Sequence, residues 1–541
     1  MPAFGLRHIL LPLFAAVLLL PLLALLGAWL PWGESGAQAT QILREMASTV
    51  LPDYAWTTLR LCLMVGVGVV LVGAASAAAV TLFDFPGRRL FEWALLLPLA
   101  MPAYVVAYAY TDFLQFSGPL QTAVRALTGA QGRVFPEVRS LGGAAWVFTF
   151  ALYPYVYLLA RTALGERATH LMEAARLLGA PLGRRIRTVA LPLARPAVAA
   201  GAALALMETL SDFGVSSYFG IQTFSAGIYK AWLAMDNRIA AAQLATLLLL
   251  VVAALLRLEY RAQQKMRFTH PRGGRGASAE ARPVALAGGH LWLAWLVCAA
   301  PVLFGFVAPV LFMLHPLLAD WTVLPWVRFL EWGFNSLRLA AFTSVLAVLV
   351  ALVLAFAARR SSDWLTRSTV QLAGLGYAVP GAVVVVGLLL PVGWIQAAAP
   401  DSSVGYYLTA TSLGLMWAYL VRFCAVALQS VQSGYSRIPV SFDDSARTLG
   451  SGGLRLATRV HWPLLRRSTA AAALLVFVDV MKELPATLVL RPFNSDTLAV
   501  VAYQLARDER LGEAALPCLA LVLVGLIPVL LLSRTLRAAA N

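Results

Sequence analysis

Four carboxylates near the ends of two apolar segments are the side chains best placed to bind a cation. Glu208 and Asp212 are four residues apart, and they recur as Asp479 and Glu483 at a constant offset of 271 positions. An i, i+4 spacing puts both acids of a pair on one helix face. A charge within a membrane span costs about 2.5 to 3.5 kcal/mol and normally faces a protein interior or water. The two pairs therefore predict an acidic lining along the route of a cation.

The same acids have a structural alternative. Four basic side chains also fall within apolar segments, namely Arg60, Arg338, Arg422 and Lys482. The acids could neutralise these bases, or they could cap helices at the membrane interface. The residue spacing does not distinguish the two interpretations.

Other residue types that carry chemistry show no site pattern. The six histidines lack ligand spacing such as H-x-x-x-H and none pairs with a cysteine, while the four cysteines all lie in apolar runs. No G-x-x-x-x-G-K-[ST] motif is present to hold ATP, and no Ser/His pair indicates a membrane-embedded enzyme. We expect no metal site, no cofactor and no enzymatic activity in this chain.

A charged stretch between apolar runs forms a second candidate site. Residues 173–195 read EAARLLGAPLGRRIRTVALPLAR, and residues 444–467 repeat the pattern 271 positions later as DSARTLGSGGLRLATRVHWPLLRR. The apolar residues of the first copy predict a short helix that ends at Gly179, followed by a second short helix that ends near Leu191-Pro192. Such a helix could simply rest on lipid headgroups. Matched glycines and prolines in two copies favour a surface that a partner grips.

Composition places the chain in the membrane. It has 541 residues, 60% hydrophobic and 13% charged, with a mean hydropathy of +0.76. Runs of about 20 apolar residues and the absence of barrel-like alternation predict an all-α polytopic protein. The twelve expected spans are 8–30, 58–83, 92–113, 142–160, 196–213, 240–256, 291–314, 336–358, 369–394, 406–430, 468–482 and 513–533.

The distribution of the positive charge predicts the orientation of these spans. With the N-terminus inside, the inside segments hold 28 of the 42 Lys and Arg, and the outside segments hold 10. By the positive-inside rule, both termini and both charged stretches are cytoplasmic. The net charge of +16 therefore reflects topology and does not indicate nucleic-acid binding.

The chain reads as a duplicated unit. Leu59-Arg60-Leu61 recurs as Leu337-Arg338-Leu339, and residues 263–289 form a stretch rich in Arg, Gly, Ala and Pro with no apolar period. We expect a first six-helix repeat over 1–262, a cytoplasmic linker over 263–289 and a second six-helix repeat over 290–541. An even number of spans per repeat gives both copies the same orientation.

The stretch EAARLLGA, followed by Leu191-Pro192, resembles the EAA loop in permease subunits of binding-protein-dependent (type I) ABC importers. Residues 205–232 and 476–515 look like the fused two-repeat permeases of ferric-iron importers. In that family the loop forms a coupling helix that docks on an ATPase subunit. The resemblance assigns this role to Glu173, Ala174, Ala175 and Gly179, and in the second copy to Asp444, Ala446 and Gly450.

The resemblance implies a multi-pass permease of the bacterial inner membrane. Its partners would be a cytoplasmic ABC ATPase dimer, which binds the ATP and Mg²⁺, and a periplasmic substrate-binding protein. The cargo would be ferric iron, moving past Glu208, Asp212, Asp479 and Glu483. Thiamine, a polyamine or another small solute is an alternative cargo, and a secondary transporter or channel is an alternative of another class.

Overall fold

The computed structural model describes residues 3–29, 35–165, 169–267, 283–319, 321–322, 324–361 and 363–538. Nearly all of the regular structure in these ranges is helical, and the strands are one two-residue parallel pair, β1 (Phe83–Asp84) with β2 (Val284–Ala285). The expected all-α polytopic fold is confirmed.

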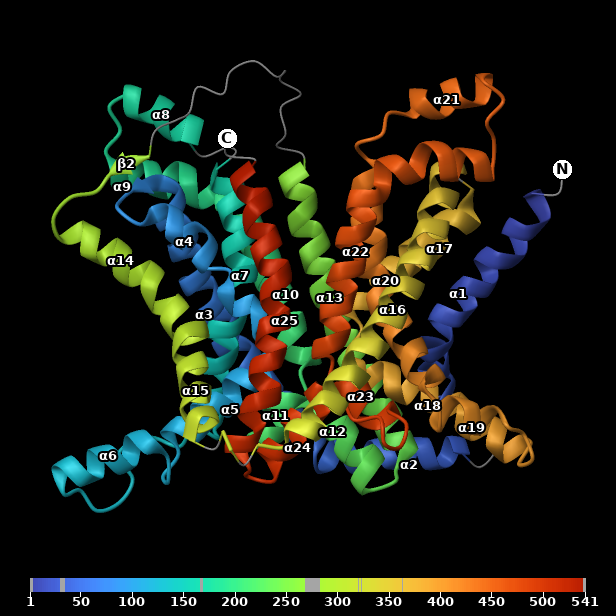
Figure 1. Cartoon of the computed structure of the whole chain (residues 1–541), viewed down its shortest axis with the longest axis horizontal. Helices are drawn as coiled ribbons and strands as arrows, with labels where there is room; N and C mark the ends of the chain where they lie inside the picture. Colours follow the sequence, from blue (N-terminus) through green and yellow to red (C-terminus); the bar gives the residue numbers. More distant parts are fainter. Residues whose placement is uncertain are drawn as a thin grey trace. The chain divides into compact units, whose positions relative to one another are not determined.

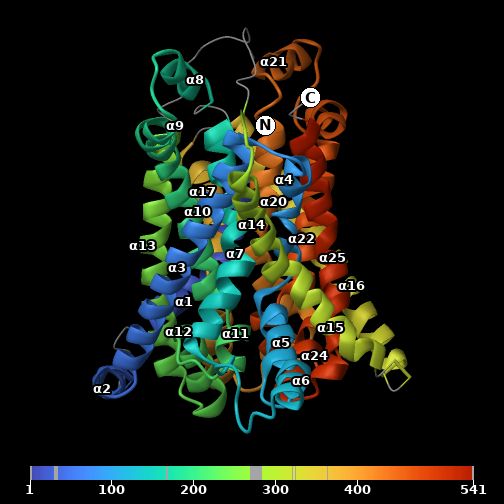
Figure 2. The same cartoon turned by 90° about the vertical axis from the view of Figure 1, so that its left-hand side faces the viewer.

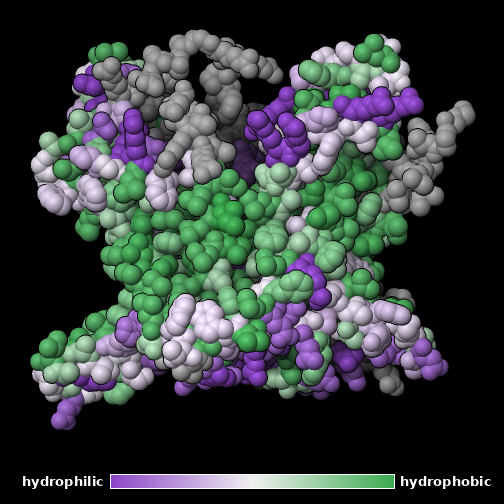
Figure 3. Space-filling view, in the orientation of Figure 1, coloured by the Kyte–Doolittle hydropathy of each residue, from purple (hydrophilic) through white to green (hydrophobic). Residues whose placement is uncertain are grey.

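Nine helices of the described chain are long and apolar enough to cross a bilayer, and one bent helix pair could form a tenth span. Two further expected spans are helical but are not among these nine. These are α1 (Ala3–Gly27) and α22 (Trp462–Lys482). On the face shown in Figure 3, apolar side chains cover the middle of the long helices and polar side chains gather toward their ends. This pattern matches a bilayer around the helix middles.

The expected span 92–113 is not one straight helix. Its two parts are bent by 89° at a short break that includes Pro102. Pro380 interrupts the corresponding segment of the second half, where η6 ends at Ala378 and α18 begins at Gly381. Proline lacks the N–H of a continuous helix and restricts the residue before it, so the backbone breaks at these positions.

The chain packs into two compact units, and each unit is considered separately. Unit 2 consists of residues 52–226, 250–324 and 502–541. Its helical elements are α3 (Leu51–Leu82), α4 (Arg88–Ala94), η1 (Leu97–Ala100), α5 (Ala103–Leu114), α6 (Pro119–Thr128), α7 (Leu141–Ala163), α8 (Thr169–Leu177), α9 (Leu182–Arg185), η3 (Ile186–Ala190), α10 (Leu191–Ser211), α11 (Gly214–Tyr218), α14 (Gly289–Val302), η5 (Leu303–Val307), α15 (Ala308–Ala319) and α25 (Leu511–Ala538). It also contains β1 and β2.

Unit 1 consists of residues 1–51, 227–249 and 325–501. Its helical elements are α1, α2 (Ser35–Ser48), η4 (Lys230–Ala234), α16 (Trp326–Arg360), α17 (Trp364–Leu375), η6 (Gly376–Ala378), α18 (Gly381–Ala398), α19 (Val404–Thr409), α20 (Ser412–Tyr435), α21 (Val440–Thr448), η7 (Leu456–His461), α22 and α23 (Pro485–Leu490). Besides α3, whose first residue Leu51 belongs to unit 1, three helices contribute residues to both units, namely α12 (Phe224–Tyr229), α13 (Arg238–Arg267) and α24 (Leu498–Arg507).

The first helix of each sequence half packs with helices of the other half. In unit 1, the indole N–H of Trp417 in α20 donates to the carbonyl of Val17 in α1 at 2.8 Å. In unit 2, the hydroxyl of Tyr110 in α5 donates to the carbonyl of Phe304 in η5 at 2.7 Å. Packing thus groups the helices differently from the repeats at 1–262 and 290–541, which stay a prediction about sequence duplication. Helix α13 continues to Arg267, and residues 268–282 of the expected linker lie outside the described residues.

A small residue allows a close helix contact in unit 2. Helices α7 and α10 run alongside each other in both views (Figures 1 and 2). A Cβ atom added to Gly201 of α10 would lie 2.6 Å from the Cα of Val156 in α7. Lipid is as apolar as a leucine side chain, so close backbone approach of this kind holds helices together in membranes.

Candidate functional site

The two charged stretches form helices at equivalent positions. Helix α8 and helix α21 each contain nine residues, and their first residues are 271 positions apart. Each lies beyond the ends of the long helices of its own unit (Figure 1). Glu173 of α8 and Asp444 of α21 are both exposed. The structure therefore presents the expected acid of each stretch on an accessible helix surface.

The two glycines of the motif end these helices in the same way. Gly179 and Gly450 both have a φ of 78°. The N–H of Gly179 donates to the carbonyl of Arg176, and the N–H of Ala180 donates to the carbonyl of Ala175. These bonds form a Schellman C-cap, in which glycine takes the left-handed conformation at little cost. Gly450 forms the same pair of bonds one repeat later.

Both helices turn large apolar side chains away from their own unit. Leu178 is 88% exposed, and Leu449 at the equivalent position is 85% exposed. Leu171 and Phe442 form a second exposed equivalent pair. Ala174 is exposed and Ala175 is half-buried, whereas Ala446 is buried. Exposed apolar surface of this kind at the end of a helix bundle is suited to binding another protein.

The second part of each stretch differs from the sequence prediction. No helix ends near Leu191-Pro192, because residues 182–211 form one continuous helix. The wider π-helical turn η3 precedes the proline, and the N–H of Leu191 donates to the carbonyl of Ile186. The turn η7 does the same before Trp462-Pro463. A π turn accommodates a proline whose missing N–H would otherwise interrupt the helix.

The four carboxylates lie at two equivalent helix breaks. Helix α10 ends at Ser211 and helix α22 ends at Lys482, and the next residue in each case has an extended ψ. Asp212 and Glu483 are these next residues, so the break positions their side chains. The expectation that each pair shares one helix face therefore fails for its second member.

The second acid of each pair caps the short helix that follows its break. The Oδ1 atom of Asp212 accepts the N–H of Val215 at 2.8 Å. The Oε1 atom of Glu483 accepts the N–H of Ala486 at 2.9 Å, and Oε2 accepts the N–H of Thr487 at 3.0 Å. Carboxylates at helix starts satisfy N–H groups that have no partner within the helix. These contacts favour the capping alternative for Asp212 and Glu483.

Glu483 is also paired with a base. It is 5% exposed, and the Nη1 atom of Arg422 donates to its Oε1 at 2.9 Å. Glu208 and Asp479 are half-buried, and each has a polar or electrostatic partner. The two acid pairs belong to different units. Their assignment to a cation route stays a prediction.

Sequence reasoning missed Asp443, which precedes the acid of the second stretch. It is buried, while Asp444 beside it is exposed. Burial raises the pKa of its carboxyl, but hydrogen bonds from Arg359 and His461 and the positive charge of Arg359 more than offset this, and the net pKa is lowered. This interaction therefore stabilises the fold above about pH 4 and is lost as the pH falls through the lowered pKa. The doublet Asp443-Asp444 was a visible signal, but its partners are 18 and 84 residues away.

Among the residues that the structure describes, no group of three or more His, Cys, Asp or Glu side chains is arranged to hold a metal ion. The geometry instead provides two protruding helices with equivalent caps and exposed apolar residues. It also provides two helix breaks lined by carboxylates. Breaks of this kind are found in membrane proteins where the backbone is buried in protein or lines a cavity.

Comparison with known proteins gives one family match. A sequence profile described as "Binding-protein-dependent transport system inner membrane component" matches residues 69–267. The chain is 24% identical over 482 residues to the Fe(3+)-transport system permease protein FbpB 2 of Haemophilus influenzae, with 88% of each chain covered. It is 25% identical to the probable ABC transporter permease protein y4fN of Sinorhizobium fredii, covering 96% of this chain and 94% of that one.

A shorter match links part of the chain to another transporter. The chain is 27% identical to the putative 2-aminoethylphosphonate transport system permease protein PhnU of Salmonella choleraesuis. This match covers 34% of the present chain and 65% of that relative. The two longer matches include parts of both sequence halves, whereas this one covers about a third of the chain.

The glycine caps can be tested by substitution. Valine at Gly179 or Gly450 is expected to destabilise the end of its helix by about 1 to 2 kcal/mol, because a β-branched residue resists the left-handed conformation. Amide exchange in that helix should rise about tenfold, measured by mass spectrometry in detergent. Asparagine, which tolerates this conformation, is the matched control and should have a much smaller effect. Equal effects of valine and asparagine would contradict the capping role.

The buried ion pair of Glu483 with Arg422 can be tested by its effect on stability. Glu483→Gln should destabilise the fold by about 3 to 5 kcal/mol, because it leaves the charge of Arg422 buried without a counter-ion. Glu509→Gln removes the partner of Arg139 from an exposed pair and should cost less than about 1 kcal/mol. Thermal unfolding of the purified variants in detergent would compare the two. A Glu483→Gln variant as stable as the control would show that this pair is dispensable.

Proposed function

This chain belongs to the binding-protein-dependent transport system inner membrane component family, and we propose that it is the permease of an ATP-driven importer of ferric iron. The family resemblance drawn from the sequence is confirmed, and the chain is a multi-pass ABC importer permease of the inner membrane. The cargo, the partner subunits, the cytoplasmic position of both termini and the binding of ATP and Mg²⁺ by a partner are parts of the proposal.

The observation that carries the proposal is the pair of equivalent end helices. Helices α8 and α21 have the same length, the same glycine cap and exposed leucines at the same position. Two equal surfaces are what a symmetric dimer of ATPase subunits would require. A secondary transporter or channel has no need of two equivalent docking helices. The arrangement therefore favours an importer that is driven by two identical subunits.

The proposed mechanism transmits motion from these surfaces to the spans. ATP binding by the partner dimer draws its subunits together, and α8 and α21 move with them. After each end helix and its glycine cap, the chain enters a π turn that continues directly into a long helix. The turn η3 continues into α10, and η7 continues into α22. Because a helix moves as a semi-rigid body, displacement of an end helix can tilt the span that follows it. Alternating access would result from this tilting.

Iron is the cargo that one of the two long relatives and the acids support best. The ferric-iron permease from Haemophilus influenzae matches over 88% of this chain, whereas the 2-aminoethylphosphonate relative matches over 34%. Ferric iron is a hard cation that prefers oxygen ligands, and carboxylates supply them. Glu208 and Asp479 lie within α10 and α22, four residues before the breaks, and we assign them to the iron route. A periplasmic binding protein would deliver the ion.

Docking of the ATPase can be tested at the exposed leucines. Leu178→Glu combined with Leu449→Glu should abolish co-purification of an ATPase subunit from native cells in mild detergent, because two charges would replace apolar contacts. Leu127→Glu is the matched control, since Leu127 is 87% exposed on α6 at the opposite end of unit 2. Mass spectrometry of the captured material would identify the ATPase. If the wild-type chain captures none, the secondary-transporter alternative is favoured.

The cargo can be tested by uptake. Cells lacking this chain should lose uptake of radioactive ferric iron and retain uptake of labelled thiamine and 2-aminoethylphosphonate. Glu208→Gln with Asp479→Asn should lower iron uptake about tenfold or more, corresponding to about 1.4 kcal/mol. Glu137→Gln, which changes an exposed acid, should have no effect. Wild-type uptake by the double variant at normal expression would rule out a role of the two acids in the iron route.

A further inference from the structure

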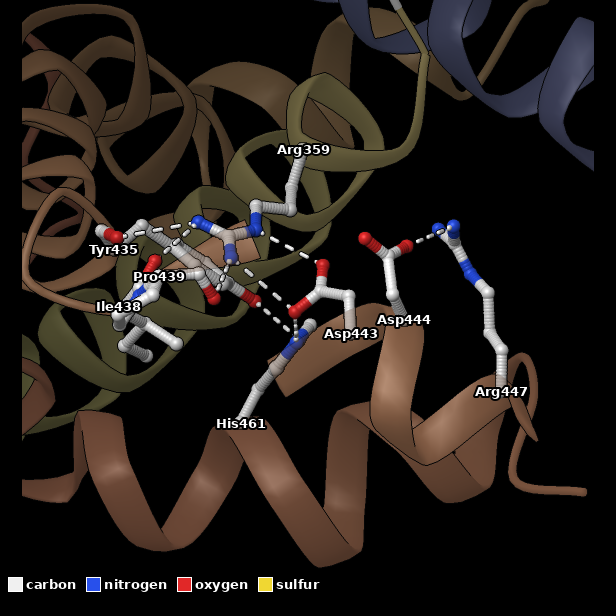
Figure 4. A network of polar contacts seen from close by, with 8 residues as sticks. All are labelled: Arg359, Tyr435, Ile438, Pro439, Asp443, Asp444, Arg447 and His461. Atoms are coloured by element: carbon white, nitrogen blue, oxygen red, sulfur yellow. Dashed lines mark hydrogen bonds and ion pairs between the residues drawn. The ribbon is translucent and has the colours of Figure 1, made fainter. Parts of the chain in front are cut away.

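The second end helix is attached to its unit by a buried polar network (Figure 4). Arg359, at the end of α16, donates from Nε to Asp443 Oδ2 at 3.0 Å and from Nη2 to Asp443 Oδ1 at 3.2 Å. Its remaining bonds go to the carbonyls of Tyr435, Ile438 and Pro439, at 3.3, 2.9 and 3.1 Å. Asp443 lies in α21. A single guanidinium therefore joins α16, the end of α20 and the end helix.

His461 extends the network to the π turn before α22. Its Nε2 lies 3.0 Å from Asp443 Oδ1, and its Nδ1 lies 3.2 Å from the hydroxyl of Tyr435. A neutral imidazole with its proton on Nε2 satisfies both contacts, since Tyr435 then donates to Nδ1 and Nε2 donates to Asp443. The charge of Arg359 is balanced by that of Asp443. The network is thus complete in hydrogen bonds and neutral in charge.

Three members of the network, Tyr435, Asp443 and His461, are buried, and Arg359 is half-buried. Asp443 is 2% exposed and His461 is 1% exposed. A buried network in which every member has its partner fixes one geometry, because displacement leaves polar groups unpaired away from water. The end helix α21 therefore has one favoured position relative to α16, α20 and α22.

The first repeat places apolar or small side chains at the same four positions. Leu164, Met172 and Ala190 precede Tyr435, Asp443 and His461 by 271 positions, and Thr81 precedes Arg359 by the 278 positions that relate the earlier spans. All four are buried. The side chain of Thr81 lies close to Gly165, just after Leu164. Arg359 similarly contacts Ile438, just after Tyr435. At these four positions, all of which are among the described residues, the first repeat therefore has no charged side chain, and the hydroxyl of Thr81 makes no hydrogen bond.

We propose that the two end helices are attached unequally, with α21 locked to its bundle by the network of Arg359, Tyr435, Asp443 and His461 and α8 held by apolar packing. The unequal attachment itself is argued from the contacts, and its effect on how force from the ATPase is transmitted rests on the proposed function. Apolar contacts permit sliding at low cost, whereas a buried charge pair does not. Movement of the partner dimer therefore reaches unit 1 directly through α21, and it reaches unit 2 through a more compliant contact. The four residues position the end helix and do not touch the cargo.

The lock is tested by giving α21 the side chains of the first repeat. The quadruple variant Arg359→Thr, Tyr435→Leu, Asp443→Met and His461→Ala should fold, since apolar replacement of a buried charge network is commonly tolerated. Its thermal unfolding temperature should stay near that of the wild type. Amide exchange over residues 440–448 should rise about tenfold, toward the rate of residues 171–177. Arg360→Gln is the matched control, because Arg360 is the exposed neighbour that lies over Phe356.

The functional consequence is tested in liposomes with the ATPase subunit and binding protein. The quadruple variant should still bind the ATPase but should hydrolyse several-fold more ATP per iron transported. Unchanged exchange in α21 would overturn the lock. Raised exchange with an unchanged ATP-to-iron ratio would overturn the positioning role. Should the quadruple variant fail to fold, Arg359→Gln and Asp443→Asn provide the same two measurements. Exchange is measured on the chain alone, so an absence of ATP-driven transport by the wild type counts against the proposed function and not against the lock.

Discussion

A backbone in lipid must satisfy its N–H and C=O groups within the protein, and the irregular parts of this molecule depend on how that requirement is met. Continuous helices satisfy it by themselves, but the chain is broken after Ser211 and after Lys482. Asp212 and Glu483 supply acceptors for the N–H groups that follow the breaks. Glu483 carries the additional cost of a buried charge, which Arg422 balances. Carboxylates at these positions thus satisfy the backbone where the helix is interrupted.

The two repeats share the same glycine caps and π turns but place different side chains behind the end helix. Positive φ at Gly179 and Gly450 and a π turn before each Leu/Trp-Pro pair are present in both. The buried contact behind the end helix is polar in one copy and apolar in the other. Backbone conformation depends on a few glycines and prolines, whereas a buried contact needs only compatible volumes and satisfied polar groups. Two copies of a duplicated unit can therefore keep the same backbone conformation and still hold their end helices with different stiffness.

The packing of each first helix with the other sequence half also follows from the properties of lipid as a solvent. A helix in lipid gains little from burying more apolar surface, so its packing partner is selected by close backbone approach and by hydrogen bonds. Trp417 to Val17 and Tyr110 to Phe304 are contacts of this kind. Each joins parts of the chain that are far apart in the sequence. Compact units and sequence repeats can differ for this reason.

The sequence by itself determined the features that depend on composition and local spacing. Apolar runs predicted the all-α membrane fold, the constant offset between the charged stretches predicted two copies of one device, and Gly179 and Gly450 predicted the helix ends. Only the tertiary structure decided that Asp443 is buried while Asp444 is exposed, that Glu483 pairs with Arg422, and which half each first helix packs against. Those outcomes depend on side chains brought together from distant parts of the chain, and local spacing carries no information about such contacts.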